Sequence, residues 1–378
     1  MRAPLPTKRH DVAVVGGGIV GLACAWYAAR RGQSVVVLER DRLGHGASGV
    51  AAGMLAPVTE ADFGEDELLQ LNVAAAARWP AFAAELEAAA GIGTGFRETG
   101  ALVVATDGDD AEELRRLADL HASLGLPSRW LSPRECRALE PGLSPRVRGA
   151  IHAPSDHQAD PAATVRALAS ACRAAGVELC ENVEVAELVE SGGRVTGVAT
   201  ATGTVEAGAV VVAAGAWTAS LAPDAPPVRP VKGQIAALRA ADPALALTHV
   251  VRTPRCYLLA RADGRIVLGA TVEERGFDLT TTADGVFRLL EAAREILPDV
   301  GELEWASVRA GLRPGTPDNL PVVGADRRDG LVWATGHFRN GVLLAPLTGA
   351  LVADLLETGA APPESLAPDR FAAAGATR

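Results

Sequence analysis

The chain has 378 residues, which excludes a single small module and fits one large domain or two interleaved ones. Hydrophobic residues make up 48% of the sequence and charged residues 22%, so a disordered chain is excluded as well. The formal net charge of −10 has the wrong sign for a protein whose whole surface binds nucleic acid.

The first predicted unit is a strand, a glycine turn and a helix. Residues 11–15 (Asp-Val-Ala-Val-Val) form a short apolar strand, Gly16-Gly-Gly-Ile-Val-Gly21 follows at once, and an alanine-rich helix is predicted over 22–31. A second buried strand is predicted over 34–38, with Glu39 at its end. This order is typical of a βαβ unit that binds a dinucleotide.

Helices and strands continue to alternate along the rest of the chain. Further helices are predicted over 66–90, 109–124, 161–175, 283–296 and 341–357, and further strands over 101–106, 176–180, 183–189, 194–199, 210–214, 234–238, 256–260, 265–269 and 331–334. Four prolines between residues 223 and 230 mark a crossing between domains. The pattern predicts an α/β protein with a Rossmann-like domain and an α+β domain built on an antiparallel sheet.

The glycine pattern Gly16-x-Gly18-x-x-Gly21 is informative because of its context. Backbone N–H groups of the turn would face a pyrophosphate at the helix N-terminus, and Glu39 would accept the ribose hydroxyls. The same pattern recurs at Gly44-x-Gly46-x-x-Gly49 without a preceding strand, so only the first copy is predicted to bind a dinucleotide. FAD and NAD share the pattern. Because no second strand-glycine-helix unit is found for a nicotinamide, a bound FAD would take its electrons from the substrate itself, as in an oxidase or a dehydrogenase.

Five further blocks of sequence carry a family signature. They are Ala47-Ser48-Gly-Val-Ala-Ala-Gly53-Met54-Leu55, Pro230-Val-Lys-Gly-Gln234, Gly269-Ala-Thr271, Gly311-Leu-Arg313-Pro-Gly-Thr316 and Gly336-His-Phe-Arg339-Asn-Gly341-Val-Leu-Leu-Ala-Pro346. Together with the glycine turn they resemble the D-amino-acid oxidase family of FAD-dependent amine oxidoreductases, in particular its glycine oxidase branch in thiamine biosynthesis. The resemblance runs in order from about residue 11 to residue 357, and the last two blocks are the most specific.

The resemblance implies a Rossmann-like FAD-binding domain of residues 1–85, 152–222 and 311–378, and a substrate-binding domain of residues 86–151 and 223–310. It also implies that FAD is held noncovalently by residues from several segments. These are Gly16, Gly18, Ile19, Val20, Gly21, Glu39 and Arg40 at the ADP part, Val183 at the adenine, Ala47, Ser48, Ala52, Gly53 and Met54 toward the flavin ring, and His337, Phe338, Arg339, Asn340, Gly341, Val342 and Leu343 at its pyrimidine edge. The helix that starts near Gly341 would point the positive end of its dipole at the flavin. Covalent attachment through a thiol near Gly311 is not expected, because no cysteine follows Cys256.

Three residues are implied to form the catalytic end of the site. Arg313 would bind the substrate carboxylate, since a guanidinium is always charged and donates two parallel hydrogen bonds. Tyr257 would donate its phenol to the same carboxylate, and Arg339 would add positive charge near the substrate. The plainer alternatives are a surface ion pair for Arg313, a core aromatic for Tyr257 and a flavin-loop anchor for Arg339.

Two neighbouring positions bear on the substrate. Val272 stands where the family often has a methionine, which leaves the pocket volume and the substrate preference open. Lys232 is expected to be a surface residue at a strand crossing rather than a catalytic base.

The activity implied by the resemblance is FAD-dependent oxidative deamination of glycine, with sarcosine and small D-amino acids as further substrates. The products would be the imine or glyoxylate, ammonia and hydrogen peroxide, with oxygen as acceptor, and the imine would feed thiazole synthesis. A D-amino-acid or N-methyl-amino-acid oxidase or dehydrogenase remains the alternative within the family. A flavin-binding subunit without turnover and an NAD-dependent reductase remain alternatives outside it, and assembly into a homo-oligomer stays open.

Other chemistry and other locations are not supported. The five cysteines contain no C-x-x-C and the seven histidines no His-Glu-x-x-His, so neither a disulfide framework nor a metal site is expected. Residues 1–10 lack the pattern of a signal peptide, and the uncharged stretch 207–223 is too short to span a membrane. A cytoplasmic enzyme without a membrane span is expected.

Overall fold

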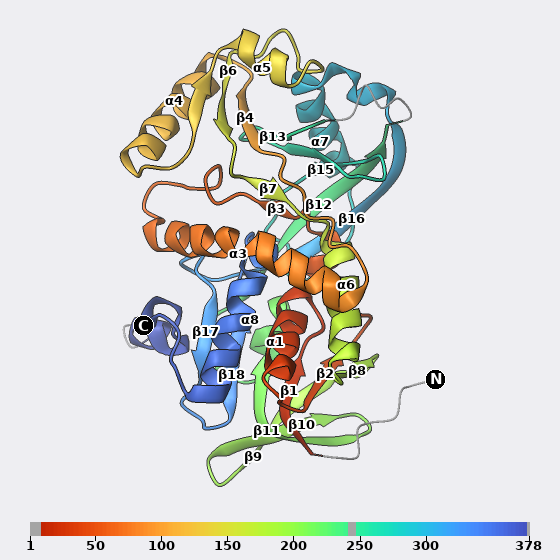
Figure 1. Cartoon of the computed structure of the whole chain (residues 1–378), viewed down its shortest axis with the longest axis vertical. Coiled ribbons are helices and arrows are strands. Elements are labelled where there is room, and N and C mark those ends of the chain that lie inside the picture. The colour runs from red at the N-terminus through yellow and green to blue at the C-terminus, as the bar shows by residue number, and fades with distance from the viewer. Residues whose placement is uncertain (1–8, 241–246, 376–378) are drawn as a thin grey trace.

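Two large β-sheets organise the computed structural model, which describes residues 9–240 and 247–375 (Figure 1). The helices are α1 (Ile19–Arg30), α2 (Ala47–Val50), α3 (Asp66–Ala90), α4 (Gly108–Ser123), α5 (Pro133–Leu139), α6 (Pro161–Ala174), α7 (Ala283–Ile296) and α8 (Gly341–Thr358). The strands are β1 (His10–Val15), β2 (Val35–Glu39), β3 (Met54–Leu55), β4 (Ala101–Ala105), β5 (Arg129–Leu131), β6 (Gly149–Ala153), β7 (His157–Gln158), β8 (Glu178–Glu181), β9 (Val185–Ser191), β10 (Arg194–Thr200), β11 (Gly203–Val212), β12 (Arg229–Arg239), β13 (Val250–Arg252), β14 (Tyr257–Ala260), β15 (Arg265–Gly269), β16 (Glu304–Gly315), β17 (Val322–Ala325) and β18 (Leu331–Thr335).

The first sheet is the predicted dinucleotide-binding sheet. Its order is β17-β18-β11-β1-β2-β8, and β1 is parallel to both β2 and β11. Val12, Ala13 and Val14 of β1 are buried because helices and other elements cover both sheet faces, which explains the continuous apolar run in the sequence. Helix α1 packs against α6 and α8, and α3 closes the same layer (Figure 1). The prediction of a Rossmann-like fold is confirmed.

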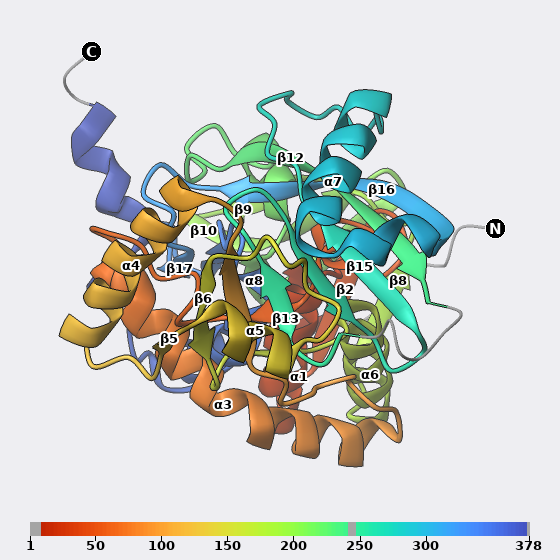
Figure 2. The ribbon, with the colours of Figure 1, turned by 90° about the horizontal axis from the view of Figure 1, so that it is seen from above.

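The second sheet is mostly antiparallel, in the order β16-β12-β15-β14-β13-β4-β6-β5. Helix α7 lies over β12 and β15, as Figure 2 shows from above. Its inward residues Leu289, Ala293 and Ile296 share one core with Leu238 and Leu268 of the sheet. The predicted α+β part with an antiparallel sheet is therefore present, with β4 and β13 as its one parallel pair among the described strands.

Strands β12 and β16 bring the two family blocks Pro230–Gln234 and Gly311–Thr316 together. They pair antiparallel over most of their length, with Val231 opposite Arg313 and Gly233 opposite Gly311. A side chain on β16 can therefore reach diagonally over the neighbouring position of β12 on the same face. This register decides where the Arg313 side chain lies.

Helix α8 is apolar along its whole length because most of it lies inside the protein. Its 18 residues are long and apolar enough to cross a membrane by composition, yet 56% of that span is buried within the fold, where it packs on α1 and α3. The helix thus has the character of a core helix.

Candidate active site

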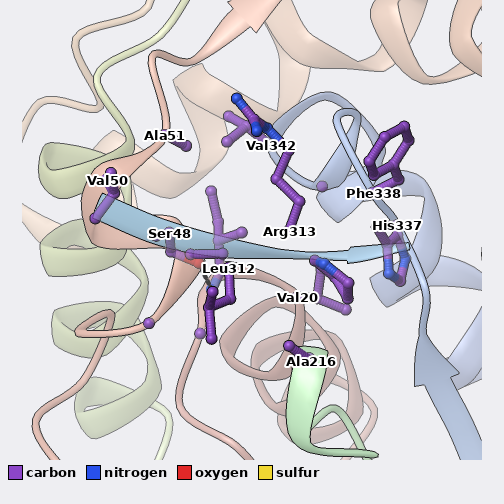
Figure 3. Close-up of a pocket in the computed structure, with 18 of the residues that line it drawn as sticks. Val20, Ser48, Val50, Ala51, Ala216, Leu312, Arg313, His337, Phe338 and Val342 are labelled. Carbon is purple, nitrogen blue, oxygen red and sulfur yellow. Dashed lines mark hydrogen bonds between the residues drawn. The ribbon is translucent and has the colours of Figure 1, made fainter. Parts of the chain in front are cut away.

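A continuous cavity runs from the glycine turn of the first sheet to the second sheet. Gly16, Glu39 and Arg40 line one end, whereas Tyr257 and Arg313 line the other. In Figure 3, Arg313 projects from β16, with Ser48, Val50 and Ala51 near one end of the visible strand and His337 and Phe338 near the other. The elements after β1, β2 and β11 thus share one cavity with strands of the second sheet.

Gly18 and Gly21 keep the turn before α1 free of side-chain atoms. A Cβ on Gly21 would strike the carbonyl oxygen of Gly16, so this glycine allows helix α1 to approach the turn. A Cβ on Gly18 would meet only the Ser48 hydroxyl, at 3.3 Å, so this position borders open cavity. Gly18, the residue before α1, has no side chain to cap the helix, and the Ile19 N–H donates to the Ser48 hydroxyl at 3.0 Å, so the positive end of α1 lies beside Ser48 at the cavity.

Glu39 is held in place by the backbone of the turn. Gly17 donates its N–H to Oε2 of Glu39 at 2.7 Å, and Asp41 donates its N–H to Oε1 at 2.9 Å. Each carboxylate oxygen has a second lone pair that can accept a hydroxyl. Nearby, Val183 donates its N–H to the Glu39 carbonyl at 2.9 Å, which ties the two predicted nucleotide contacts together.

An aromatic platform lies beside this end of the cavity. The Arg40 guanidinium sits 3.7 Å from the ring centre of Trp217, which comes from the short 3-10 helix Gly215–Ser220 after β11. The ring of Phe277 lies 5.7 Å from Trp217, between ring centres. The sequence analysis missed Trp217, although a tryptophan directly after a buried strand and a glycine is an informative signal in a chain with 4% aromatic residues.

A second helix N-terminus faces the same cavity. Helix α8 has no side-chain cap at the preceding Asn340, and Gly341 and Val342 line the cavity. His337, in the loop before it, is buried, and its Nε2 lies 2.9 Å from the Thr348 hydroxyl. Burial lowers the pKa of His337 to about 3, so this ring is neutral at physiological pH.

The geometry of the glycine turn, Glu39 and the two helix N-termini fits FAD. Two helix N-termini open into one cavity, which suits a pyrophosphate at α1 and a flavin carbonyl at α8. A carboxylate fixed by backbone N–H groups stands where a ribose would lie. The residues of the glycine turn, Glu39 and the α8 N-terminus would therefore hold the cofactor.

Arg313 is a largely buried cation that forms no ion pair with any described residue. Its Nη1 donates to the carbonyl oxygens of Thr271, at 3.1 Å, and Lys232, at 3.4 Å. Burial lowers the pKa of Arg313, but the ordinary value is so high that the guanidinium keeps its charge. The guanidinium faces the cavity without an ion pair to any described residue, so its charge is available to an anion in the cavity.

Tyr257 stands beside this guanidinium. Burial raises the pKa of the Tyr257 phenol to about 12, and the positive charge of Arg313 offsets only part of this effect. The hydroxyl is therefore protonated at neutral pH and can donate a hydrogen bond. A Cβ on Gly269 would fall on the Tyr257 ring, so the glycine of the Gly269-Ala-Thr271 block leaves room for this side chain.

Most predicted site residues line the cavity. They are Gly16, Gly18, Ile19, Val20, Glu39, Arg40, Ala47, Ser48, Ala52, Gly53, Met54, Val183, Tyr257, His337, Phe338, Arg339, Gly341, Val342 and Arg313. Gly21, Asn340 and Leu343 lie behind this surface, and Leu343 accepts a hydrogen bond from Trp79 Nε1 through its carbonyl. Glu60 and Arg252 also line the cavity, 3.5 Å apart, and neither was predicted, because no local pattern marks them.

The expectation that Lys232 is a surface residue is wrong. Its side chain is only 1% exposed, and its Nζ lies 2.8 Å from Asp278 and 3.5 Å from Glu273. Lys232 lies within β12. The segment 271–282, further along the chain, supplies the two carboxylates that compensate its buried charge.

Comparisons with known proteins agree with this geometry. The family model described as FAD dependent oxidoreductase (DAO) matches residues 11–355. The chain is 39% identical to "Glycine oxidase" of Geobacillus kaustophilus, covering 93% of this chain and 94% of that protein. It is 36% identical to "Bifunctional protein ThiO/ThiG" of Trichormus variabilis, covering 92% of this chain and 52% of the relative, so it spans about half of that protein.

A solved structure supports the same conclusion. The crystal structure of glycine oxidase from Geobacillus kaustophilus superposes with a TM-score of 0.90 and 37% identity, covering 96% of this chain and 99% of that one. A cavity suited to a dinucleotide, a family match over nearly the whole chain and this superposition agree. The chain belongs to the D-amino-acid oxidase (DAO) family of FAD-dependent oxidoreductases.

Proposed function

We propose that this protein is an FAD-dependent glycine oxidase. It converts glycine, water and oxygen into glyoxylate, ammonia and hydrogen peroxide, and its imine product supplies thiazole synthesis in thiamine biosynthesis. The relative named "Glycine oxidase" and the relative named "Bifunctional protein ThiO/ThiG" support both parts of this proposal.

The unpaired charge of Arg313 is the observation that carries the substrate assignment. A glycine carboxylate placed against this guanidinium would form the ion pair that Arg313 makes with no described residue. The protonated Tyr257 hydroxyl would donate to the same carboxylate. Arg339, which lines the cavity and stacks 5.0 Å from the Phe338 ring, would add positive charge at the same end.

The protein contributes orientation and electrostatics to this reaction. When bound, FAD accepts the electrons of the substrate C–H bond and passes them to oxygen. Arg313 and Tyr257 fix the carboxylate, so the α-carbon and the amine are held toward the centre of the cavity. The α8 N-terminus stabilises negative charge at its end of the site, and His337 adds no positive charge there because its ring is neutral.

The two-domain assignment extends this proposal. We assign residues 1–85, 152–222 and 311–378 to the FAD-binding domain and residues 86–151 and 223–310 to the substrate-binding domain. The first sheet draws its strands from the first set of segments, and most strands of the second sheet come from the second set. Strand β16 of the second sheet crosses the assigned domain boundary at residue 311. Arg313 lies on the part of this strand after the boundary and lines the cavity.

We also place the reaction in the cytoplasm, without a membrane span. The five cysteines are buried and unpaired, as is usual in a reducing compartment. The apolar helix α8 is used as a core helix. Measuring the mass of the protein in solution would show whether copies of the chain assemble into a homo-oligomer.

The visible spectrum of the purified protein tests the activity. Glycine added in the absence of oxygen should bleach the flavin band at about 450 nm. Readmitted oxygen should restore the band and form peroxide. The variant Arg313→Met should keep the band but need far higher glycine concentrations to bleach it. A band that sarcosine or D-alanine bleaches but glycine does not would overturn the glycine assignment, and a protein without a flavin band would overturn the whole proposal.

A related substrate is the second candidate. Val272 lines the cavity and is 57% exposed, so the wall beside Thr271 is open rather than filled. This observation favours acceptance of an N-methyl or α-methyl group, as in sarcosine or D-alanine. Parallel titrations with these amines measure the preference directly.

A further inference from the structure

Lys232 is a buried ammonium group outside the cavity. Its side chain is 1% exposed, and its Nζ lies 2.8 Å from Asp278 Oδ2 and 3.5 Å from Glu273 Oε2. Removing a charged group from water is costly unless its partners are well placed, so these two carboxylates must stay close to β12. Both belong to the segment 271–282 between β15 and α7, called here the bridging segment.

The bridging segment is tied to β12 at both ends. Near its start, Glu273 Oε1 accepts from the Thr271 hydroxyl at 2.6 Å and from Gln234 Nε2 at 2.8 Å. At its end, Thr282 donates its N–H to Gln234 Oε1 at 2.8 Å. Lys232 supplies the positive charge that pairs with Glu273 and Asp278, and Arg229 of β12 pairs with the neighbouring Glu274 at 3.5 Å.

This network continues to the Arg313 guanidinium through two carbonyl groups. Lys232 and Glu273 exchange backbone hydrogen bonds, each at 2.9 Å, which fixes the bridging segment beside β12. The carbonyl of Lys232 and the carbonyl of Thr271 are the two acceptors for Arg313 Nη1. The position of the segment therefore determines where the second acceptor of Arg313 lies.

We infer that Lys232 is a positioning residue for substrate binding: its ion pairs with Asp278 and Glu273 hold the bridging segment so that two backbone carbonyls fix the Arg313 guanidinium. This inference rests on the proposed role of Arg313 as the carboxylate receptor. Lys232 does not line the cavity and touches no reacting atom, so its effect reaches the substrate through Arg313.

The first test is the variant Lys232→Met, which keeps the aliphatic length and removes the charge. Acetate, which has the carboxylate of glycine but no amine, is titrated against the FAD-loaded protein, and its binding is followed by the shift of the flavin absorbance. The dissociation constant for acetate should rise about tenfold, because the hydrogen bonds that orient a charged group are disturbed. KM for glycine should rise by a similar factor, while kcat should change by less than about threefold.

A second readout uses the apoprotein. Arg275 is exposed in the bridging segment, so trypsin cleavage after Arg275 reports whether the segment is held. Lys232→Met should be cleaved faster than the unchanged protein. The matched control is Glu291→Gln, which removes an exposed carboxylate of α7 outside the bridging segment; this variant should change neither acetate binding nor cleavage.

Three outcomes distinguish the ideas. Faster cleavage with unchanged acetate affinity would show that Lys232 only stabilises the segment and would overturn the positioning role. Acetate that fails to bind the unchanged FAD-loaded protein would overturn the proposed role of Arg313 and, with it, this inference. If Lys232→Met does not fold, the variants Asp278→Ala and Glu273→Gln replace it, because each removes one carboxylate that pairs with Lys232. Unchanged acetate affinity in both variants would also overturn the inference.

Discussion

The guanidinium of Arg313 lies directly over Gly233, diagonally across the β12–β16 pair. A Cβ on Gly233 would come within 2.6 Å of Arg313 Cζ, and closer still to both terminal nitrogens. The glycine of the Pro230–Gln234 block is thus required by a side chain from the distant Gly311–Thr316 block. Two blocks that are distant in the sequence thus meet at the proposed carboxylate-binding position.

Gly233→Ala should therefore disable substrate binding while leaving the cofactor in place. The added methyl group overlaps the guanidinium and must displace it from its position over residue 233. We therefore expect KM for glycine and the dissociation constant for acetate to rise about tenfold or more. FAD content, measured from the visible spectrum, should not change. Gly108→Ala is the control, because a Cβ there meets nothing within 4 Å. Unaltered acetate binding in Gly233→Ala would show that Arg313 is not the receptor.

Glu39→Ala should weaken FAD binding. The substitution removes the acceptor of the Gly17 and Asp41 N–H groups and the proposed acceptor of the ribose hydroxyls. Hydrogen bonds to charged groups contribute about 1.5–3 kcal/mol, so the dissociation constant for FAD should rise by about 10- to 100-fold. Titration of the apoprotein with FAD, followed by fluorescence, measures it. Glu187→Gln on the exposed part of β9 should bind FAD like the unchanged protein; equal affinity in Glu39→Ala would remove Glu39 from the nucleotide site.

Local patterns were sufficient to predict several elements. Helices α3 and α7 begin and end where the sequence placed them, because acidic residues open α3 and the Thr282 hydroxyl accepts from the Gly285 N–H to start α7. Helix α1 begins three residues earlier than predicted, at Ile19, because the glycine turn itself forms its first turn. Most residues that were predicted to form the site also line the cavity.

Features that depend on distant partners could not be predicted in the same way. Strand β16 is half exposed near its start and lacks a clean alternation, and it forms through pairing with β12. The burial of Lys232 depends on carboxylates about forty residues further along the chain, and a lysine is ordinarily exposed. Trp217 and Glu60 reach the site from segments without a motif.

His337 should make the protein less stable in mild acid. Its folded pKa of about 3 lies below the ordinary value of 6.5, so the unfolded state binds more protons between these two values. The contribution is complete above about pH 6.5 and is lost progressively as the pH falls toward about 3, at about 1.4 kcal/mol per pH unit. His337→Gln keeps a group that can bond to Thr348 but does not titrate, so the free-energy difference between the unchanged apoprotein and this variant should shrink from about pH 7 to about pH 5. Urea unfolding at both pH values measures it, and a difference independent of pH would mean that His337 is not held neutral by burial.

Val272→Met should narrow the choice of substrate. Val272 lines the cavity next to Thr271, whose carbonyl helps to hold Arg313, and more than half of its surface is exposed. A longer side chain at this position would occupy space that a substituent on the amine or α-carbon of the substrate needs, whereas glycine has no such substituent. The ratio of kcat/KM for D-alanine to kcat/KM for glycine should fall about tenfold, the usual effect of one methyl group in a confined pocket. Leu279→Met is the matched control, because Leu279 lies in the same bridging segment but does not line the cavity. If Val272→Met lowers both kcat/KM values equally, or neither, the position does not set the breadth of the pocket.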